Sequence, residues 1–474
     1  MMKKTKIICT LGPSSRDEKV MEEMLKAGMN AARLNFSHGT HEEHRKTIET
    51  FRRVRDRLGV AAAVVLDTKG PEIRLGDFKN GEEMLEEGSM FTLTSEKCEG
   101  TSSRVSVSYR QLPSQVSEGT RILIDDGRLS MKVVSASETD ISCVVEAGGP
   151  VSSRKGVNIP GQSLDLEYIS EADVQDILFG IEMDVDYIAA SFVRNAKDVR
   201  KLRNLLEENG GSNIKIISKI ENTEGIDNFR EILELSDGIM IARGDMGVEV
   251  DFEKLPGIQK KFIKECCKAG KTVITATQML ESMTSNPAPT RAEITDVANA
   301  VFDGTSAVML SGESAAGEYP VETVKTMSRI VCQAELDAEE ISRNGMLEVK
   351  ADEGDVSNAM GHAACTTATD INAGAIIAVT TSGYTAEMTA KYKPKKPVIA
   401  ATPREKTYHQ QALTRGVYPL LTEVRDNWND LMDEALKSAE KMGFVKKGDL
   451  VVFSAGMPLQ VSGTTNLVRV TAVR

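Results

Sequence analysis

Charged side chains stand at the ends of short apolar runs along the first two thirds of the chain. Two acids, Glu221 and Asp245, end successive runs and can share one divalent cation, because Mg²⁺ is commonly held by one or two carboxylates and substrate oxygens. Lys219 supplies a point positive charge beside them, and Arg33 supplies a planar fork suited to phosphate or carboxylate. A divalent cation, a lysine and an arginine that face one pocket can stabilise the negative charge of a phosphoryl group during its transfer. A Schiff-base role for Lys219 and simple ion pairing of the two acids are the alternatives that stay open.

Other runs are followed by hard oxygen donors and by backbone donors. The oxygen donors are Asn35, Ser37, Asp67 and Thr68. One carboxylate with neutral oxygens suits a weakly charged cation better than a transition metal, and loop hydrogen bonding is the alternative. Segment 242–247 carries two glycines at a predicted strand end, where backbone N–H groups can grip a substrate carboxylate or simply form a tight turn.

Three histidines, His38, His41 and His44, invite comparison with a zinc site. The H-E-x-x-H pattern of zinc proteases is not formed, because Arg45 occupies the position of its second histidine. His41 and His44 fall in the first turns of a helix predicted after Thr40, where we expect both rings to be in solvent. His38 lies at the rim just beyond the strand predicted over residues 31–35 and is the one histidine that we keep as a site residue.

The apolar runs predict the elements that position these side chains. Continuous rather than alternating apolarity is typical of parallel strands that are covered on both faces. Polar residues at the ends of the runs lie about 26 to 34 residues apart, as successive βα units require. The pattern predicts a (β/α)₈ barrel, in which active-site residues follow the carboxyl ends of the strands. The eight runs are residues 6–11, 31–35, 61–67, 186–192, 214–219, 238–242, 272–277 and 306–310.

The helices between the runs are predicted to begin at capping boxes, in which Ser or Thr is followed three residues later by an acid. The matching pairs are Ser15 with Glu18, Thr40 with Glu43, Ser170 with Asp173 and Thr290 with Glu293.

Two further domains are predicted beside the barrel. About 124 residues separate Asp67 from Ser191, far more than one βα unit. Residues 71–167 contain short alternating stretches and turns, which predicts an inserted β-barrel or sandwich. Without them, residues 1–70 and 168–340 have about the length of one (β/α)₈ barrel. After residue 340 strands and helices alternate again, which predicts an open α/β domain over residues 341–474.

The composition excludes several classes of protein. The chain has 474 residues and a formal net charge of −12, with 41% hydrophobic and 27% charged residues. This is typical of a globular protein, and the negative field opposes binding to nucleic acid or an anionic membrane. No run approaches the roughly 18 apolar residues of a membrane span, so no membrane partner is expected. The odd number of cysteines, 7, without a CxxC pair favours reduced thiols in a cytoplasmic protein.

With these residues assembled, the chain resembles the pyruvate kinase family over essentially its whole length. The matching stretches are ARLNFSHG (32–39), LDTKGPEIR (66–74), KGVNIPG (155–161), ISKIEN (217–222), ARGD (242–245) and ATQMLESM (276–283). The resemblance implies transfer of a phosphoryl group from phosphoenolpyruvate to ADP, giving ATP and pyruvate. It also implies a homotetramer, with possible allosteric control through the C-terminal α/β domain.

The resemblance implies a role for each matching residue. The catalytic residues would be Lys219, Arg33 and Thr277, and the substrate would bind these three together with Gly244 and Asp245. The ligands would be Glu221 and Asp245 for Mg²⁺ or Mn²⁺, and Asn35, Ser37, Asp67 and Thr68 for K⁺. The nucleotide would contact Asn35, His38, Arg74 and Lys155. Glutamate at position 72 is typical of the K⁺-requiring members, which predicts activation by K⁺.

Two regulatory features follow from the same resemblance. Because Lys155 lies in the insertion, we expect that domain to close over ADP as a lid and to exclude water. Loop 380–386 reads TTSGYTA and has none of the basic residues that often grip a sugar bisphosphate in the family. Hydroxyl groups at a helix start can still bind phosphate, so a monophosphate effector and no effector are equally consistent with this loop.

Two other function classes compete with this interpretation. One is a barrel enzyme that works through a Mg²⁺-bound enolate, such as a carbon–carbon lyase or an aldolase of 2-oxo acids. Such an enzyme has no need to seat ADP with His38, Arg74 and Lys155. The other is a non-catalytic metabolite sensor, which predicts a broken metal or lysine position, and none is broken in this sequence.

Overall fold

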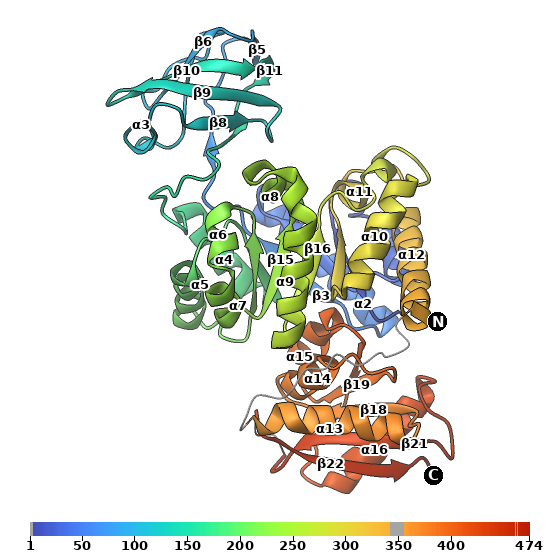
Figure 1. Cartoon of the computed structure of the whole chain (residues 1–474). Coiled ribbons are helices and arrows are strands. Elements are labelled where there is room, and N and C mark those ends of the chain that lie inside the picture. Colours follow the sequence, from blue (N-terminus) through green and yellow to red (C-terminus); the bar gives the residue numbers. More distant parts are fainter. Residues whose placement is uncertain (1–2, 342–354, 460, 462) are drawn as a thin grey trace.

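The computed structural model describes residues 3–341, 355–459, 461 and 463–474. In Figure 1 the inserted β domain lies at one end of the molecule, the barrel in the middle and the C-terminal α/β domain at the other end. A closed parallel barrel, an inserted sheet and an open C-terminal sheet are all present, so the predicted fold class is confirmed. None of the helices in the described ranges combines the length and the apolarity that a bilayer crossing needs.

The eight predicted barrel strands are confirmed, with ends within two residues of the predicted ones. They are β1 (Lys6–Thr10), β2 (Ala31–Asn35), β3 (Ala63–Asp67), β13 (Tyr187–Ala190), β14 (Lys215–Ile220), β15 (Gly238–Ala242), β16 (Thr272–Ala276) and β17 (Ala307–Leu310). Ile8 of β1 belongs to the cluster inside the barrel, whereas Ile7 and Cys9 pack in the cluster shared with the helices. Burial on both faces explains why the runs are apolar throughout.

Helices surround the barrel and continue the βα alternation (Figure 1). The long ones are α1 (Glu18–Ala27), α2 (His41–Leu58), α4 (Glu171–Glu182), α5 (Ala196–Glu208), α9 (Leu255–Ala269), α10 (Arg291–Asp303) and α12 (Pro320–Ile341). Shorter ones are α6 (Thr223–Asp227), α7 (Phe229–Leu235), α8 (Arg243–Glu249) and α11 (Gly312–Ala315), with 3₁₀ turns η1 (Phe252–Lys254) and η2 (Glu281–Thr284).

Three of the four predicted capping boxes are confirmed, at Thr40, Ser170 and Thr290. The box predicted at Ser15 is wrong. Helix α1 begins at Glu18, and Asp17 caps it by accepting hydrogen bonds from the first backbone N–H groups. Ser15 is fully buried, and its Oγ accepts from the backbone N–H of Gly12 at 3.1 Å. The serine is therefore used by the turn after β1 and not by the helix.

The inserted domain is built around its own apolar core. Its elements are β4 (Ile73–Arg74), β5 (Glu82–Leu85), β6 (Met90–Thr94), β7 (Arg104–Ser106), α3 (Leu112–Gln115), β8 (Arg121–Ile124), β9 (Leu129–Ala136), β10 (Asp140–Ala147), β11 (Gly149–Ser152) and β12 (Gly156–Asn158). Seven strands form one sheet that begins with β4 and ends with β7. A bridge between Leu75 and Val107 joins these two edges, so the sheet curls back on itself around the core.

The C-terminal domain has a five-stranded sheet in the order β20, β19, β18, β21, β22, of which only β22 is antiparallel among the described residues. Its strands are β18 (Ala375–Val379), β19 (Val398–Thr402), β20 (Val417–Leu421), β21 (Leu450–Gly456) and β22 (Thr465–Ala472). Its helices are α13 (Val356–Asp370), α14 (Tyr384–Ala390), α15 (Glu405–Gln410) and α16 (Trp428–Lys441), with the 3₁₀ turn η3 (Gln411–Leu413). The alternation expected after residue 340 is thus present from α13 onward.

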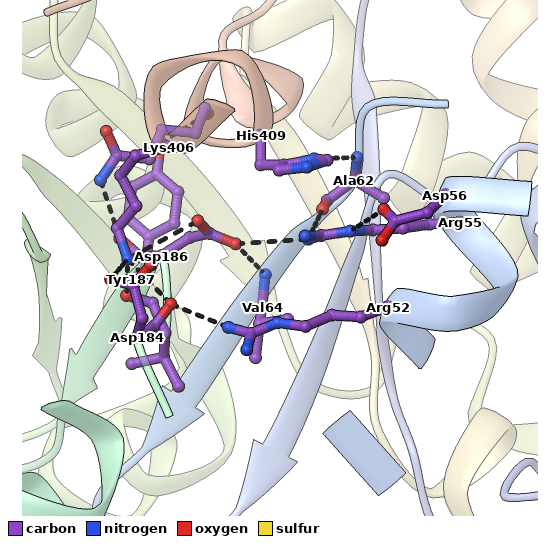
Figure 2. A network of polar contacts seen from close by, with 12 residues as sticks. Arg52, Arg55, Asp56, Ala62, Val64, Asp184, Asp186, Tyr187, Lys406 and His409 are labelled. Atoms are coloured by element: carbon purple, nitrogen blue, oxygen red, sulfur yellow. Dashed lines mark hydrogen bonds and ion pairs between the residues drawn. The ribbon is translucent and has the colours of Figure 1, made fainter. Parts of the chain in front are cut away.

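Helix α15 docks this domain onto the amino ends of β3 and β13, through the network drawn in Figure 2. Lys406 donates to Asp184 Oδ1 at 2.6 Å, and Asp186 beside it accepts a backbone N–H of β3 at 2.7 Å. His409 Nδ1 accepts from the backbone N–H of Ala62 at 3.4 Å. Burial, reinforced by nearby arginine and lysine charges, lowers the pKa of His409 to about 3, so the ring is a neutral acceptor at physiological pH.

Candidate active site at the carboxyl end of the barrel

A buried cluster of opposite charges lies at the carboxyl ends of β2, β3 and β14. Arg33 Nε lies 2.5 Å from Asp67 Oδ2, and Lys219 Nζ lies 3.0 Å from Asp67 Oδ1. Lys219 Nζ also lies 3.1 Å from Glu221 Oε1. The two carboxylates are 1% exposed. The strand register places Asn35 opposite Asp67, so adjacent strands end together and bring these side chains into contact.

The opposite charges in this cluster stabilise one another's ionised forms. Burial opposes ionisation of Asp67, but Arg33 and Lys219 outweigh it and hold the pKa of that carboxyl below its ordinary value. Burial likewise opposes the charge on Lys219, but Asp67 and Glu221 raise the pKa of its ammonium group. A lysine that forms a Schiff base must be neutral to attack a carbonyl. The environment of Lys219 therefore favours a fixed positive charge over a nucleophilic amine.

Glu221 and Asp245 form the acid pair that was singled out for a divalent cation. Burial, together with the charge of Asp245, raises the pKa of Glu221 to about 7, although Lys219 and the backbone N–H of Phe192 at 2.6 Å act in the other direction. Within the described ranges no three His, Cys, Asp or Glu side chains gather as a metal site. Two hard carboxylates that destabilise each other fit Mg²⁺ or Mn²⁺ when a substrate supplies further oxygens.

Thr277 has a strained backbone at the carboxyl end of β16. Its φ of +68° is rare for a β-branched residue, and such strain clusters at functional sites. Thr277 Oγ1 accepts from the backbone N–H of Gly244 at 2.8 Å. The Arg243 guanidinium donates to the carbonyl of Thr277 at 2.6 Å and lies 2.8 Å from Asp296. These contacts hold the hydroxyl of Thr277 against the first turn of α8.

The four oxygen donors proposed for a monovalent cation follow β2 and β3. Asn35 Oδ1 accepts from the backbone N–H of Ser37 at 3.2 Å. Thr68 Oγ1 accepts from the backbone N–H of Ser191 at 3.1 Å. Both oxygens of Asp67 already accept hydrogen bonds, from Arg33, Lys219 and Ser191. A K⁺ ion would share the Asp67 carboxylate with these donors, which its low charge density allows.

A cavity of about 700 Å³ lies between the inserted domain and the barrel. The predicted nucleotide residues His38, Arg74 and Lys155 line it, and so does Asp245. Arg74 is paired with Glu72 at 2.6 Å, and Lys155 Nζ lies 2.8 Å from Asp125 Oδ1. The structure thus brings together positive side chains from the insertion and a proposed metal ligand from the barrel.

Sequence reasoning missed two residues of this region. Ser191 Oγ lies 2.7 Å from Lys219 Nζ and 3.2 Å from Asp67 Oδ1, inside the charged cluster. Its position near the end of the apolar run 186–192 was the available signal. Asp126 lies in the turn after β8 and lines the cavity, where burial and the charge of Asp245 raise its pKa. Only the folding of the insertion over the barrel makes these two acids neighbours.

The expectation for His44 is wrong. Its ring is 6% exposed, stacks on Phe36 at a centroid distance of 4.1 Å, and has Nε2 2.9 Å from the His38 carbonyl oxygen. The helix that carries it packs this face inward, so the ring supports the loop of His38. His41 is exposed, as expected, and its Nε2 lies 2.6 Å from Asp176.

Loop 380–386 lines a second, smaller cavity of about 40 Å³ in the C-terminal domain. Thr380, Thr381 and Thr385 line it, and so does Arg425. Arg425 is already paired with Glu423 at 2.8 Å and Glu434 at 2.9 Å, so its charge is largely compensated.

Comparison with known proteins agrees with this geometry. Models of the families "Pyruvate kinase, barrel domain" and "Pyruvate kinase, alpha/beta domain" match residues 2–324 and 358–471. A pyruvate kinase of Clostridium acetobutylicum is 48% identical over 475 residues, which cover 100% of both chains. One from Staphylococcus haemolyticus is 49% identical over 470 residues, which cover 99% of this chain and 80% of that relative. By these matches over its whole length, on a fold of three parts, the chain belongs to the pyruvate kinase family of phosphotransferases.

Proposed function

We propose that this chain transfers the phosphoryl group of phosphoenolpyruvate to ADP, giving ATP and pyruvate, the last step of glycolysis. The observation that carries the proposal is the buried cluster of Arg33, Asp67, Lys219 and Glu221, which adjoins the cavity lined by Asp245 and Lys155. In the transition state of the transfer, negative charge is distributed over the oxygens of the phosphoryl group. Fixed positive charges in a buried site stabilise that charge.

Lys219 and Arg33 would act on the phosphoryl group from opposite sides of Asp67. Because Asp67 pairs with both, it holds their side chains in place without a rearrangement during the reaction. Lys219 would also stabilise the enolate that remains after transfer. Thr277, held against α8, would lie near the carbon that is protonated to give pyruvate.

Glu221 and Asp245 would hold the divalent cation, Mg²⁺ or Mn²⁺, which supplies charge neutralisation between the substrate's oxygens when it is bound. The backbone N–H groups of Gly244 and Asp245 would receive the substrate carboxylate. Because the Gly244 amide donates to Thr277 Oγ1, the carboxylate would compete with that hydroxyl for the amide. Binding of substrate would therefore leave the Thr277 hydroxyl with only its hydrogen bond to the carbonyl of Ala276, to which it donates at 2.6 Å.

ADP would lie in the cavity under the inserted domain, in contact with Asn35, His38, Arg74 and Lys155. Closure of that domain would exclude water and prevent loss of the phosphoryl group to hydrolysis. Both Arg74 and Lys155 are paired with carboxylates at the cavity wall, and a nucleotide would exchange these partners for phosphate oxygens. K⁺ would bind among Asn35, Ser37, Asp67 and Thr68.

The remaining features proposed from the resemblance concern regulation and assembly. The hydroxyl groups of loop 380–386 would take a phosphorylated effector of modest charge, because Arg425 is paired with acids. A homotetramer and a cytoplasmic location are proposed with it; the free state of all seven cysteines supports the location.

The experiment that tests the function measures pyruvate formed from phosphoenolpyruvate and ADP with Mg²⁺, in K⁺ and in Na⁺ buffer. We expect pyruvate in both buffers and a faster rate in K⁺. No pyruvate from folded protein would refute the function. Borohydride trapping of a 2-oxo acid on Lys219 would then support the aldolase alternative, which the raised pKa of that lysine disfavours.

A further inference from the structure

One cysteine and one lysine from different domains are in contact at the ends of their helices. Cys267 lies in the last turn of α9 in the barrel, and Lys393 lies just after α14 in the C-terminal domain. The Lys393 amine is hydrogen-bonded to the Cys267 thiol. Neither side chain lines the cavity beneath the inserted domain or the one at loop 380–386. The pair therefore takes no part in the reaction proposed above.

Contacts on both sides hold this pair in place. Lys393 has a φ of +47°, and its backbone N–H donates to the carbonyl of Ala390 at 2.8 Å. Pro394 follows it directly and restricts the backbone further. On the barrel side, Cys267 Sγ donates to the carbonyl of Gly304 at 3.5 Å. The thiol and the amine are therefore presented to each other by fixed segments of the two domains.

Two glycines let the domains approach closely at this point. Gly304 has a φ of +97°, and a Cβ built on it would collide with Lys393 Nζ and lie 3.8 Å from Cys267 Sγ. Gly270, with a φ of +70°, ends α9, and a Cβ there would lie 2.6 Å from Met388 Cε of α14. Any larger residue at position 304 would displace the lysine from the thiol, so glycine there preserves the contact.

Cys267 differs from the buried thiols of the chain in its access to solvent. Burial raises the pKa of the thiols of Cys143, Cys266 and Cys365, which disfavours the thiolate that reacts with a peroxide. Cys267 is partly exposed and lines a space of about 40 Å³ together with Lys393. One water molecule needs about 10–15 Å³ of such space, so hydrogen peroxide, with two oxygens, can reach the thiol.

Lys393 has the environment of a nucleophilic amine. Burial lowers the pKa of its ammonium group, helped by the charge of Arg415 and opposed by Cys267 and Asp303. A lowered pKa increases the neutral fraction of the amine, and the neutral amine is the form that attacks an electrophile. Lys219 is the opposite case, because two carboxylates keep that lysine charged.

We propose that Cys267 and Lys393 form a covalent cross-link on exposure to hydrogen peroxide. The Cys267 thiol takes one oxygen from the peroxide, which gives a sulfenic acid and one water. The neutral amine of Lys393 then attacks the sulfur, a second water leaves, and an S–N bond forms, as sulfenic acids form with backbone nitrogen. The sulfur loses two electrons to one peroxide, and the protein loses one hydrogen from the thiol and one from the amine. A small thiol reverses the link by attacking the sulfur and releasing the amine, and a second thiol restores Cys267.

The cross-link would fix the end of α9 to the end of α14. Because a bond between residues far apart in the sequence restricts the unfolded chain, the oxidised protein is expected to unfold at a higher temperature than the reduced protein. Reduction is expected to reverse this rise. The inference is independent of the proposed function, since it uses none of the residues assigned to substrate, nucleotide or metal.

Non-reducing peptide mapping by mass spectrometry tests the proposal on the full chain. The protein is treated with hydrogen peroxide, its remaining thiols are alkylated, and it is digested with trypsin. Wild type is expected to yield a peptide pair that joins Cys267 to Lys393 and is two hydrogen atoms lighter than the separate peptides. Dithiothreitol is expected to separate the pair. Cys98→Ser, which removes a partly exposed thiol of the insertion, is the matched control and is expected to cross-link as wild type does.

Two variants remove one partner each. Cys267→Ser lacks the sulfur and is expected to give neither the peptide pair nor the rise in unfolding temperature. Lys393→Arg keeps the positive charge, but a guanidinium stays protonated and cannot attack the sulfur. Its sulfenic acid is therefore expected to persist and to be labelled by dimedone more than in wild type. If Lys393→Arg does not fold, Lys393→Gln replaces it, because glutamine also lacks a nucleophilic amine.

Three outcomes would overturn the proposal. One is a disulfide between Cys266 and Cys267, which also removes two hydrogen atoms but within a single peptide. Another is equal labelling of Cys267 by dimedone in wild type and in Lys393→Arg, since the lysine would then not consume the sulfenic acid. The third is peroxide-treated wild type in which Cys267 is still a thiol.

Discussion

Replacement of Lys219 by Met tests the charged cluster in two independent ways. The Lys219 side chain is buried and contacts Asp67, Glu221 and Ser191. Removing one preorganised electrostatic group from a transition-state site lowers kcat by about 10²- to 10³-fold, and we expect at least that loss in pyruvate formation. A lysine at an open rim would leave stability unchanged, but this one is enclosed by the carboxylates it pairs with.

The same substitution is expected to cost stability. Asp67 keeps its ion pair with Arg33 at 2.5 Å, so the loss falls mainly on Glu221, which is left buried with one backbone donor. Without Lys219 the pKa of Glu221 rises above its value of about 7, so the carboxyl takes up a proton and the cost stays at the lower end of the range for a broken buried pair. Breaking a buried ion pair by removing one partner lowers the free energy of unfolding by about 3–5 kcal/mol. Because other contacts survive, we expect Lys219→Met to lower it by about 3 kcal/mol, the lower end of that range. The double variant Lys219→Met with Glu221→Gln replaces the unpaired carboxyl by a neutral amide and is expected to recover most of this stability while staying inactive.

The assays are urea unfolding for the free energy and coupled pyruvate formation for kcat. Lys437→Met, at an exposed site of α16, serves as the matched control and is expected to change the free energy of unfolding by less than about 0.5 kcal/mol. Unchanged kcat in Lys219→Met would refute the catalytic role. Unchanged stability would refute the reasoning about burial, and failure of the double variant to recover it would show that the cost does not arise at Glu221.

Three further outcomes are expected. Glu221→Gln should weaken activation by Mg²⁺ by about tenfold or more, and a metal titration that matches wild type would contradict the ligand assignment. Glu72→Lys should relax the K⁺ requirement, at some cost in ADP affinity because Glu72 pairs with Arg74, and rates in K⁺ and Na⁺ buffer decide this. His409→Gln should make stability less sensitive to acid. The pKa of His409 in the folded chain, about 3, lies below its ordinary value, so the unfolded chain takes up the proton first as the pH falls. The free energy of unfolding of wild type should therefore fall by about 2 kcal/mol between pH 6.5 and 5. Urea unfolding at the two pH values measures this loss, and an equal loss in the variant would contradict it.

The barrel strands and most of the charged rim were predictable because both are local in the sequence. Apolar runs at βα spacing predict parallel strands, and the residue that follows each run lies on the catalytic end of the barrel. The pair Asn35 and Asp67 shows this well, since strand register alone places them opposite each other. The capping boxes at Thr40, Ser170 and Thr290 were equally local.

Features that depend on distant segments were not predictable. The box at Ser15 failed because the turn after β1 takes up its hydroxyl, and His44 is buried because its helix packs that face against Phe36. The approach of Asp126 to Asp245 depends on how the insertion folds over the barrel. No periodicity in the chain encodes such contacts.

The sequence by itself determined which side chains gather at the carboxyl end of the barrel, because their order along βα units dictates their order around the ring. Only the tertiary structure decided their ionisation and the sites between domains. Lys219 is a fixed cation because it is buried against two carboxylates. The cavity beneath the insertion exists because Lys155 of the insertion and Asp245 of the barrel, far apart in the sequence, meet there. Burial and partner choice are properties of the packed chain, since they depend on what else occupies the surrounding space.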